Sequence, residues 1–147
     1  MAGYSGTPLP RKLGIEPGAR VGLIRPPDDF AETLGELPEG TTARPLGPDG
    51  QFDVIVCFCR NTKELLRDLP GLPARLDPAG GLWIAWPKKS SGLPTDLGEA
   101  EVRGRGLGTG LVDNKVCAID DTWSGLRFVV RLADRKKKKI SVPRQTR

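Results

Sequence analysis

The sequence contains no histidine. This absence excludes catalysis by Ser-His-Asp or Cys-His groups, HExxH zinc sites, and any mechanism that needs an imidazole base near neutral pH. No uninterrupted apolar run approaches the ~20 residues of a membrane-spanning helix, and residues 1–10 lack both the apolar stretch and the positive start of a secretory signal. We therefore expect a cytoplasmic protein whose three cysteines are free thiols.

The length and the charge distribution predict one domain with a basic tail. The chain has 147 residues, and a typical domain has ~100 to 200. We expect a lead segment over residues 1–17 that packs on the domain, a single α/β domain over 18–134 and a disordered tail over 135–147. The tail holds seven basic residues and no acidic one, whereas residues 1–134 hold 16 basic and 18 acidic residues, a net charge of −2. The folded part is therefore not basic.

The basic tail has two interpretations. Its lysines, if they bind RNA or a ribosome, would gain free energy from the counterions that phosphates release. A run of like charges also keeps a protein soluble without any specific partner. The nucleic-acid candidates are Lys136, Lys137, Lys138 and Lys139.

Apolar runs separated by glycine and proline predict an alternation of strands and helices. The clearest strand spans residues 52–59, where alternate side chains on both faces are apolar, which is typical of a central strand in a parallel sheet covered by helices. Gly80 and Gly81 are assigned to a turn that precedes a strand. We expect strands over 19–24, 41–46, 52–59, 82–86, 111–119 and 126–132, with helices opened by Asp29, by Asn61 and by Thr95 or Asp96.

This order of elements predicts a Rossmann-like α/β fold with helices on both faces of the sheet and a C-terminal antiparallel hairpin. It resembles a shortened class I methyltransferase, in which the segments Phe52–Val56 and Leu76–Ile84 correspond to the fourth strand and the loop before the fifth. A nucleotide-like cofactor in such a fold needs a glycine-rich turn after the first strand. The turn here is Arg25-Pro26-Pro27-Asp28, and proline lacks an amide donor. We therefore expect no S-adenosylmethionine and no other cofactor.

A polar segment after the strand 82–86 is the first candidate binding site. Ligands of open α/β sheets bind beyond the carboxyl ends of the strands. Lys88, Lys89, Ser90 and Ser91 supply two ammonium groups and two hydroxyls there, which suit a phosphate or a carboxylate. The alternative is a solvated loop with both lysines facing water.

A second polar cluster lies in the hairpin. Asp113 and Lys115 are two residues apart, so on a strand they share a face and either line a pocket or form an exposed ion pair. Asp120 begins a turn that carries Trp123, whose ring either folds back on the core or contacts a partner. We expect these residues, together with Asp96, to converge with the Lys88 segment on one polar pocket.

Cys57 and Cys59 point the same way on one strand, which raises the question of a metal site. A structural zinc site uses four Cys or His ligands, and only Cys117 remains. Free cysteine packs as a small apolar residue. We therefore expect core packing and no metal.

Several blocks of the sequence resemble the bacterial family catalogued as Domain of Unknown Function 3052. The resemblance runs from about Gly3 to Arg131 and implies a small bacterial cytoplasmic protein, without implying any activity. The matching blocks are Tyr4–Leu9, Lys12–Gly14, Trp86–Lys89, Thr95–Leu97, Gly110–Asp120 and Thr122–Leu126.

Three functions are compatible with these features. The leading hypothesis is a non-catalytic binding module for an anionic small ligand or partner on a degenerate methyltransferase-like scaffold. The second is a divergent transferase, such as a methyltransferase that uses S-adenosylmethionine, with Asp113 or Asp120 as a general base whose pKa is raised by burial. The third is an RNA- or ribosome-associated protein that binds through its tail.

Overall fold

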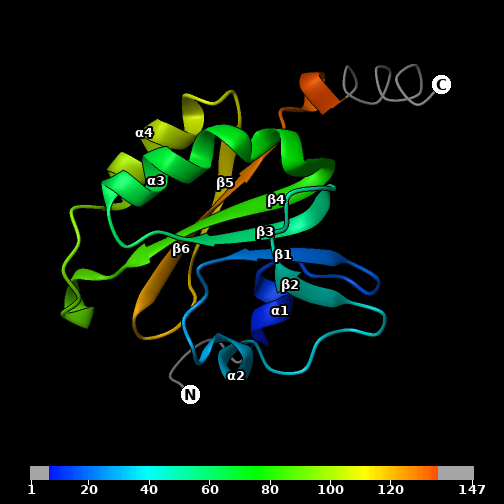
Figure 1. Ribbon diagram of the computed structural model, residues 1–147, viewed down its shortest axis with the longest axis horizontal. Helices are drawn as coiled ribbons and strands as arrows, with labels where there is room; N and C mark the ends of the chain where they lie inside the picture. The colour runs from blue at the N-terminus through cyan, green and yellow to red at the C-terminus, as the bar shows by residue number, and fades with distance from the viewer. Residues whose placement is uncertain (1–6, 136–147) are drawn as a thin grey trace.

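The computed structural model describes residues 7–135 and shows a mixed six-stranded sheet with the order β2-β1-β3-β4-β6-β5 (Figure 1). Strands β2, β1, β3 and β4 are parallel, while β6 runs antiparallel to both β4 and β5. The predicted parallel sheet with a C-terminal hairpin is confirmed. The strands are β1 (Arg20–Ile24), β2 (Thr42–Pro45), β3 (Phe52–Phe58), β4 (Leu76–Pro87), β5 (Val112–Ala118) and β6 (Trp123–Val129).

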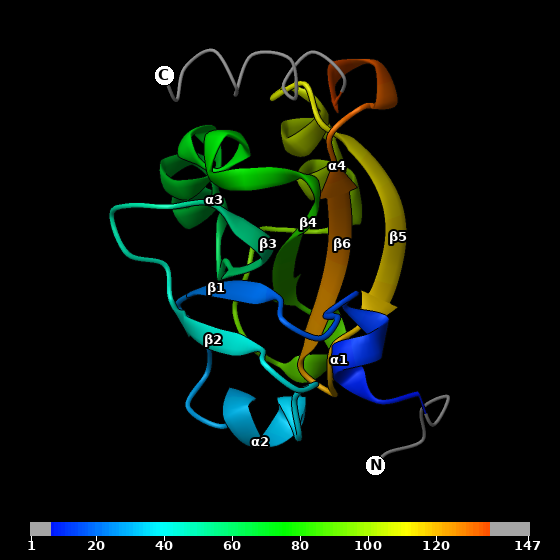
Figure 2. The ribbon, with the colours of Figure 1, turned by 90° about the vertical axis from the view of Figure 1, so that its right-hand side faces the viewer.

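Helices cover both faces of this sheet, as predicted. Figure 1 shows α3 and α4 on one side of the sheet and α1 and α2 on the other, and Figure 2 shows the same layers after a quarter turn. None of the helices in the described part of the chain is long and apolar enough to span a membrane. The helices are α1 (Leu9–Lys12), α2 (Phe30–Leu34), α3 (Thr62–Asp68) and α4 (Glu99–Leu107), with short 3-10 turns η1 (Leu69–Gly71), η2 (Pro73–Arg75) and η3 (Lys89–Ser91).

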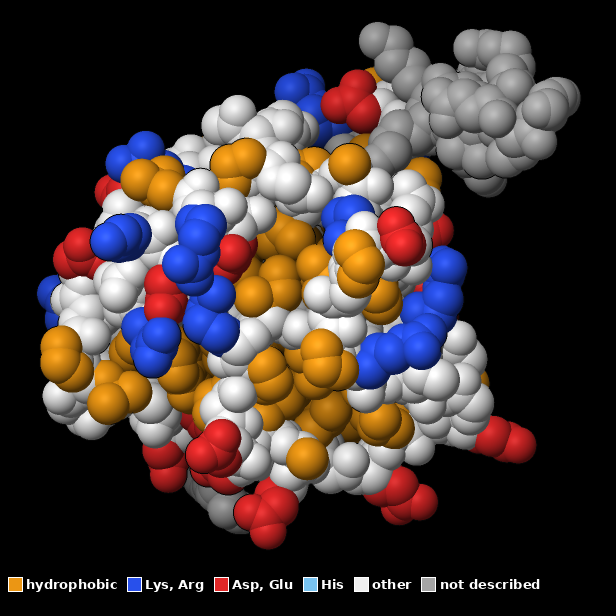
Figure 3. All heavy atoms as spheres, in the orientation of Figure 1, with side chains coloured by type: hydrophobic (Ala, Val, Ile, Leu, Met, Phe, Trp, Pro, Cys, Tyr) orange, Lys and Arg blue, Asp and Glu red, His pale blue; other side chains and the backbone are white. Residues whose placement is uncertain are grey.

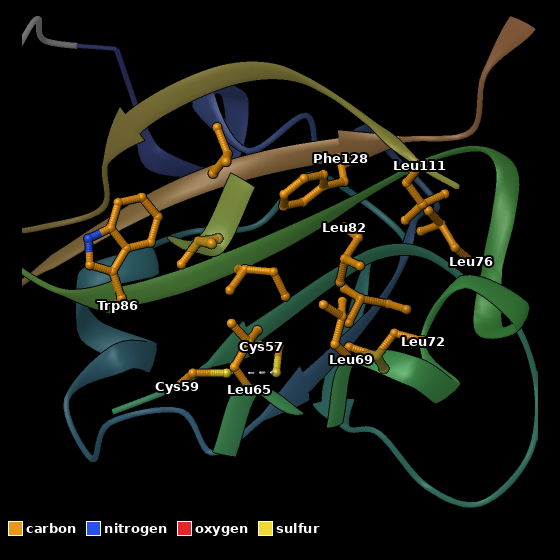
Figure 4. Packing of buried hydrophobic residues seen from close by; sticks show 14 of the residues in the cluster. Cys57, Cys59, Leu65, Leu69, Leu72, Leu76, Leu82, Trp86, Leu111 and Phe128 are labelled. Atoms are coloured by element: carbon orange, nitrogen blue, oxygen red, sulfur yellow. Dashed lines mark hydrogen bonds between the residues drawn. The ribbon is translucent and has the colours of Figure 1, made fainter. Parts of the chain in front are cut away.

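The central strand β3 separates two hydrophobic clusters. Ile55, Cys57 and Cys59 pack in the cluster under α3 and α4, part of which Figure 4 shows, whereas Val54 and Val56 pack in the cluster on the other face. All five side chains are buried. The alternation read from the sequence therefore predicts both faces of β3 correctly, because a strand with period two that is apolar on both sides is stable only inside a covered sheet.

The lead segment is anchored on the α1 side of the sheet. Leu9, Leu13 and Ile15 are buried in the same cluster as Val54 and Val56. At the other end of the described chain, residues 132–135 form a helical turn, and Arg135 donates from Nε to the carbonyl oxygen of Val130 at 2.9 Å.

Strand β4 is longer than the sequence predicts. It begins at Leu76, so the assignment of Gly80 and Gly81 to a turn is wrong. The register between β3 and β4 shifts between Phe52 and Val54, and a Cβ at Gly80 would overlap the carbonyl oxygen of Asp53. The glycine permits this close approach of two backbones, which is a role of glycine inside strands.

The predicted helix starts are correct at α3 and wrong at α4. Asn61 accepts a hydrogen bond from the Glu64 amide at 2.9 Å, as an N-cap residue does. Helix α4 instead begins after Gly98, without a side-chain cap, so neither Thr95 nor Asp96 opens it. Asp29 precedes α2, and its side chain also makes no capping hydrogen bond.

Candidate functional site

The carboxyl ends of β1 and β3 form the position where an open α/β sheet binds its ligands. The chain leaves β1 for β2 on one side and returns to β3 on the other, so the direction of strand order reverses between β1 and β3. Ligands bind in the crevice at this reversal. We call this place the carboxyl-edge crevice.

Arg25 fills the carboxyl-edge crevice. It follows β1 with a φ of 54°, an uncommon conformation for a residue with a side chain. Its Nε donates to the carbonyl oxygen of Phe58 at the end of β3, over 3.1 Å. The same guanidinium forms ion pairs with Glu64, at 3.2 Å, and with Asp68, both on α3. One side chain thus links the ends of both strands to the helix above them.

The charges in the carboxyl-edge crevice are matched. The side chain of Glu64 is only 10% exposed, and hydrogen bonds from Arg60 lower its pKa to about 2, with help from the charge of Arg25. Burial lowers the pKa of Arg25, but its hydrogen bond and ion pairs with Asp68 and Glu64 outweigh that effect, so the pKa is raised. In the view of Figure 3, basic and acidic side chains are interspersed on the left of the molecule.

A shallow cavity of about 330 Å³ remains beside Arg25. Its floor is aromatic, because the ring of Phe58 packs edge-on against Trp123 at 5.1 Å between centroids. Trp123 is 7% exposed, so its ring folds back on the core as one of the two predicted alternatives states. The cavity is lined by Arg25, Pro26, Pro27, Asp28, Phe58, Arg60 and Trp123.

The Lys88 segment and the Asp120 turn lie together at this same edge. The Lys88 amide donates to the carbonyl oxygen of Thr122 at 2.7 Å. Lys89 and Ser90 are exposed. Ser91 stabilises the turn instead, because its Oγ donates to the Lys88 carbonyl at 2.7 Å.

Two of the predicted carboxylates at this edge cap backbone amides. Asp120 Oδ1 accepts from the amides of Thr122 and Trp123, both at 2.8 Å. Asp96 accepts from the Thr62 amide at 2.7 Å, and that hydrogen bond lowers its pKa. Asp96 therefore accepts from the first turn of α3 and does not open α4. Both carboxylates fix backbone segments at this edge of the sheet.

Asp113 and Lys115 do not join this edge, so the prediction of one shared pocket is wrong. A bulge in β5 separates them. Asp113 pairs with Arg103 of α4 at 2.9 Å, whereas Lys115 donates to the Lys12 carbonyl of α1 at 2.9 Å, on the opposite face. Asp113 also lies opposite Phe128, far along β6 from the hairpin turn that contacts Lys88.

The bonding of Asp113 also bears on its predicted role as a general base. The hydrogen bond from Arg103 lowers the pKa of Asp113. A carboxylate that acts as a base near neutral pH needs a raised pKa. Asp113 is therefore an ion-pair partner.

Cys57 and Cys59 are buried with their sulfur atoms 3.6 Å apart, joined by the dashed line in Figure 4. A carboxylate oxygen of Asp68 completes a group of three potential metal ligands within 4.8 Å of one another. That carboxylate already pairs with Arg25. The hydrogen bond that the Cys57 thiol donates to Cys59, together with burial, raises the pKa of Cys57, which keeps it a neutral thiol.

Lys136, Lys137, Lys138 and Lys139 lie outside the described residues, so their binding to RNA stays a prediction. Arg25 and Arg60 were missed by the sequence analysis. The sequence shows that both arginines directly follow predicted strands, but Asp68, the partner of Arg25, lies 43 residues away along the chain. No local sequence pattern predicts an ion pair across that separation.

The fold defined by these elements is that of class I methyltransferases. The chain is similar to the structure of a ribosomal protein L11 methylase from Lactobacillus delbrueckii subsp. bulgaricus, with a TM-score of 0.56 and 13% identity over 84% of this chain and 75% of that one. It is less similar to TrmN from Thermus thermophilus, with a TM-score of 0.49 and 18% identity over 84% of this chain and 47% of that one. No protein-family model and no curated protein sequence matches the chain.

Such a fold implies S-adenosylmethionine at the carboxyl-edge crevice, and the residues present do not fit it. Arg25 occupies the space between the ends of β1 and β3. Pro26 and Pro27 supply no amide donors, and the loop has no glycine over which a cofactor could approach the backbone. The likeness to methylases therefore concerns the fold alone.

Proposed function

We propose that this protein is a non-catalytic binding module for an anionic ligand, built on a methyltransferase-like scaffold. The observation that carries the proposal is the Arg25 side chain in the carboxyl-edge crevice, tied to Phe58, Glu64 and Asp68. The chain itself fills the space that a cofactor takes in this fold class.

Opening the crevice is unfavourable. A cofactor there displaces Arg25 and leaves Glu64 and Asp68, whose side chains are 10% and 16% exposed, without this partner. Removing one partner of a buried ion pair costs about 3 to 5 kcal/mol. A ligand binds there only if its own contacts contribute more free energy than this cost. The proline loop offers it few new hydrogen bonds.

The exposed cations at the rim of the crevice support an anionic ligand. The Arg60 side chain is 63% exposed beside the shallow cavity, and Lys89 is exposed next to Ser90. The hydrogen bond between Lys88 and Thr122 fixes the Lys88 segment to the hairpin that carries Trp123. A ligand that lies on Trp123 would direct its charge toward Arg60 and Lys89.

A thermal shift titration with S-adenosylmethionine tests the non-catalytic part. A ligand at 100 times its Kd stabilises the folded protein by about 2.7 kcal/mol, which raises the Tm of a domain of this size by several degrees. We expect no shift at millimolar cofactor. A saturable shift together with methyl transfer to any acceptor contradicts the proposal.

The second part of the proposal, that the ligand is an anion, is tested on protein purified from its host, with the bound ligand identified by native mass spectrometry. We expect the double variant Lys88→Ala with Lys89→Ala to lower the affinity for that ligand at least tenfold. Arg44→Ala with Arg131→Ala is the matched control, because both residues are exposed and the net charge changes equally. Equal affinities in the two double variants would rule out the Lys88 segment as the binding site.

A further inference from the structure

A second cavity lies at the opposite edge of the sheet, where β1 and β3 begin, and we call it the amino-edge pocket. Its volume is about 420 Å³, within the range of ~300 to 1,000 Å³ typical of small-molecule sites. Glycine, alanine and proline form most of its wall, so few side-chain atoms project into it. The lining residues are Gly14, Glu16, Pro17, Gly18, Ala19, Asp53, Ala79, Gly80 and Arg127.

Arg127 reaches this pocket across strand β4. It lies on β6 opposite Trp83, on the face that α1 covers. A Cβ at Gly81 would lie 2.7 Å from Arg127 Cζ, so the guanidinium rests directly on the glycine backbone. At the far end, a Cβ at Gly14 would lie 3.8 Å from Arg127 Nη2. Two glycines therefore make the space that this side chain occupies.

The guanidinium of Arg127 has no counterion among residues 7–135. Its Nε is buried and is the single buried side-chain nitrogen or oxygen atom among residues 7–135 without a hydrogen-bond partner. No ion pair to Arg127 occurs within those residues, whereas Arg20, Arg25 and Arg103 each pair with a carboxylate. Burial lowers the pKa of Arg127, and the positive charge of Arg135 lowers it further.

The acidic groups of the amino-edge pocket do not neutralise Arg127. Asp53 is committed to Arg20, from which it accepts hydrogen bonds at 2.8 to 3.2 Å through both carboxylate oxygens. Glu16 is exposed and forms no ion pair within residues 7–135. Neither carboxylate forms an ion pair with Arg127.

We propose that the amino-edge pocket binds a small oxyanion, a carboxylate or a phosphate, through Arg127. A guanidinium binds two oxygens of such a group with parallel hydrogen bonds. The small side chains of the wall leave room for the anion beside the guanidinium. This site is separate from the carboxyl-edge crevice and does not depend on the function proposed for that edge.

Isothermal titration with inorganic phosphate and with acetate, each against chloride at constant ionic strength, tests the site. We expect saturable binding of one of the two, which identifies the oxyanion class. Arg127→Gln removes the charge and should abolish binding, while Arg127→Lys keeps the charge without the paired donors and should weaken binding about tenfold. The exposed Arg44→Gln is the control and should bind as the unaltered protein does.

Circular dichroism melts of all variants separate loss of the site from loss of the fold. Saturable binding that survives in a folded Arg127→Gln variant overturns the proposal. So does the absence of binding by both anions to the unaltered protein at 50 mM. A saturable melting shift with S-adenosylmethionine together with methyl transfer would instead contradict the function proposed for the carboxyl edge and leave this site intact.

Discussion

Each edge of the sheet holds a partly buried arginine, and the two arginines differ in their partners. At the carboxyl edge, Arg25 has a carbonyl oxygen and two carboxylates as partners. At the amino edge, Arg127 has a buried Nε with no partner within the described residues. At the edge that binds ligands in this fold class, the chain itself pairs the arginine, whereas the arginine at the other edge has no ion pair within residues 7–135. Topology and unsatisfied groups therefore point to different edges of the sheet.

Replacing Arg25 should have the largest effect on stability. Arg25→Met leaves Glu64 and Asp68 short of a partner in a largely buried place, so the free energy of unfolding should fall by about 3 kcal/mol. Urea unfolding measures it, with Arg44→Met expected to change it by less than about 0.5 kcal/mol. A loss as small as that of the control would mean that the ion pairs of the crevice contribute nothing.

Acid should weaken the carboxyl edge next. The pKa of Glu64 is about 2 in the folded protein, below the ~4.3 of a free glutamate. Its contribution is therefore complete above about pH 5 and is lost as pH falls toward 2, by about 2 kcal/mol once screening at the exposed Arg60 is allowed for. Unfolding free energies between pH 5 and pH 2 should fall less steeply in Glu64→Gln. An identical slope in that variant would contradict the assignment.

Filling the space under Arg127 should have a smaller effect. Gly81→Ala places a Cβ against the guanidinium, and we expect it to cost about 1 to 2 kcal/mol and to remove oxyanion binding. Gly104→Ala on α4 is the control, since nothing lies within 4 Å of a Cβ there. That control should stabilise by about 0.5 to 1 kcal/mol. Normal oxyanion binding by Gly81→Ala would show that Arg127 does not have to lie against the Gly81 backbone to bind the anion.

Removing Arg127 itself should have the smallest effect, and in the opposite direction to Arg25. Arg127→Met deletes a partly buried charge without breaking an ion pair within residues 7–135. We expect the free energy of unfolding to stay the same or to rise by up to about 1 kcal/mol. A fall of 2 kcal/mol or more in urea unfolding would show that Arg127 is a structural residue.

The fold was predictable because its signals are local. The two-sided apolar strand β3 and the cap of α3 by Asn61 each depend on residues within one element. Gly80 and Gly81 gave the wrong prediction because glycines mark both turns and close approaches inside strands. Only the register of β4 against β3 distinguishes the two cases.

The sites were less predictable because they depend on distant pairs and on one irregularity. The bulge in β5 places Asp113 and Lys115 on opposite faces of the sheet, and no residue type in that segment predicts a bulge. Arg127 did carry a signal, since it interrupts the apolar pair Leu126 and Phe128. Alternation along residues 126–132 places Arg127 on the face opposite to Leu126 and Phe128, but only the structure shows that the α1 segment covers that face.

The most direct test follows the side-chain Nε–H signals of Arg25 and Arg127 by nitrogen-15 NMR, assigned with Arg25→Lys and Arg127→Lys. We predict that phosphate or acetate shifts the Arg127 signal saturably, while the Arg25 signal stays constant with either anion and with S-adenosylmethionine. A response of Arg25 to S-adenosylmethionine, with Arg127 silent to every oxyanion, would contradict the account at both edges.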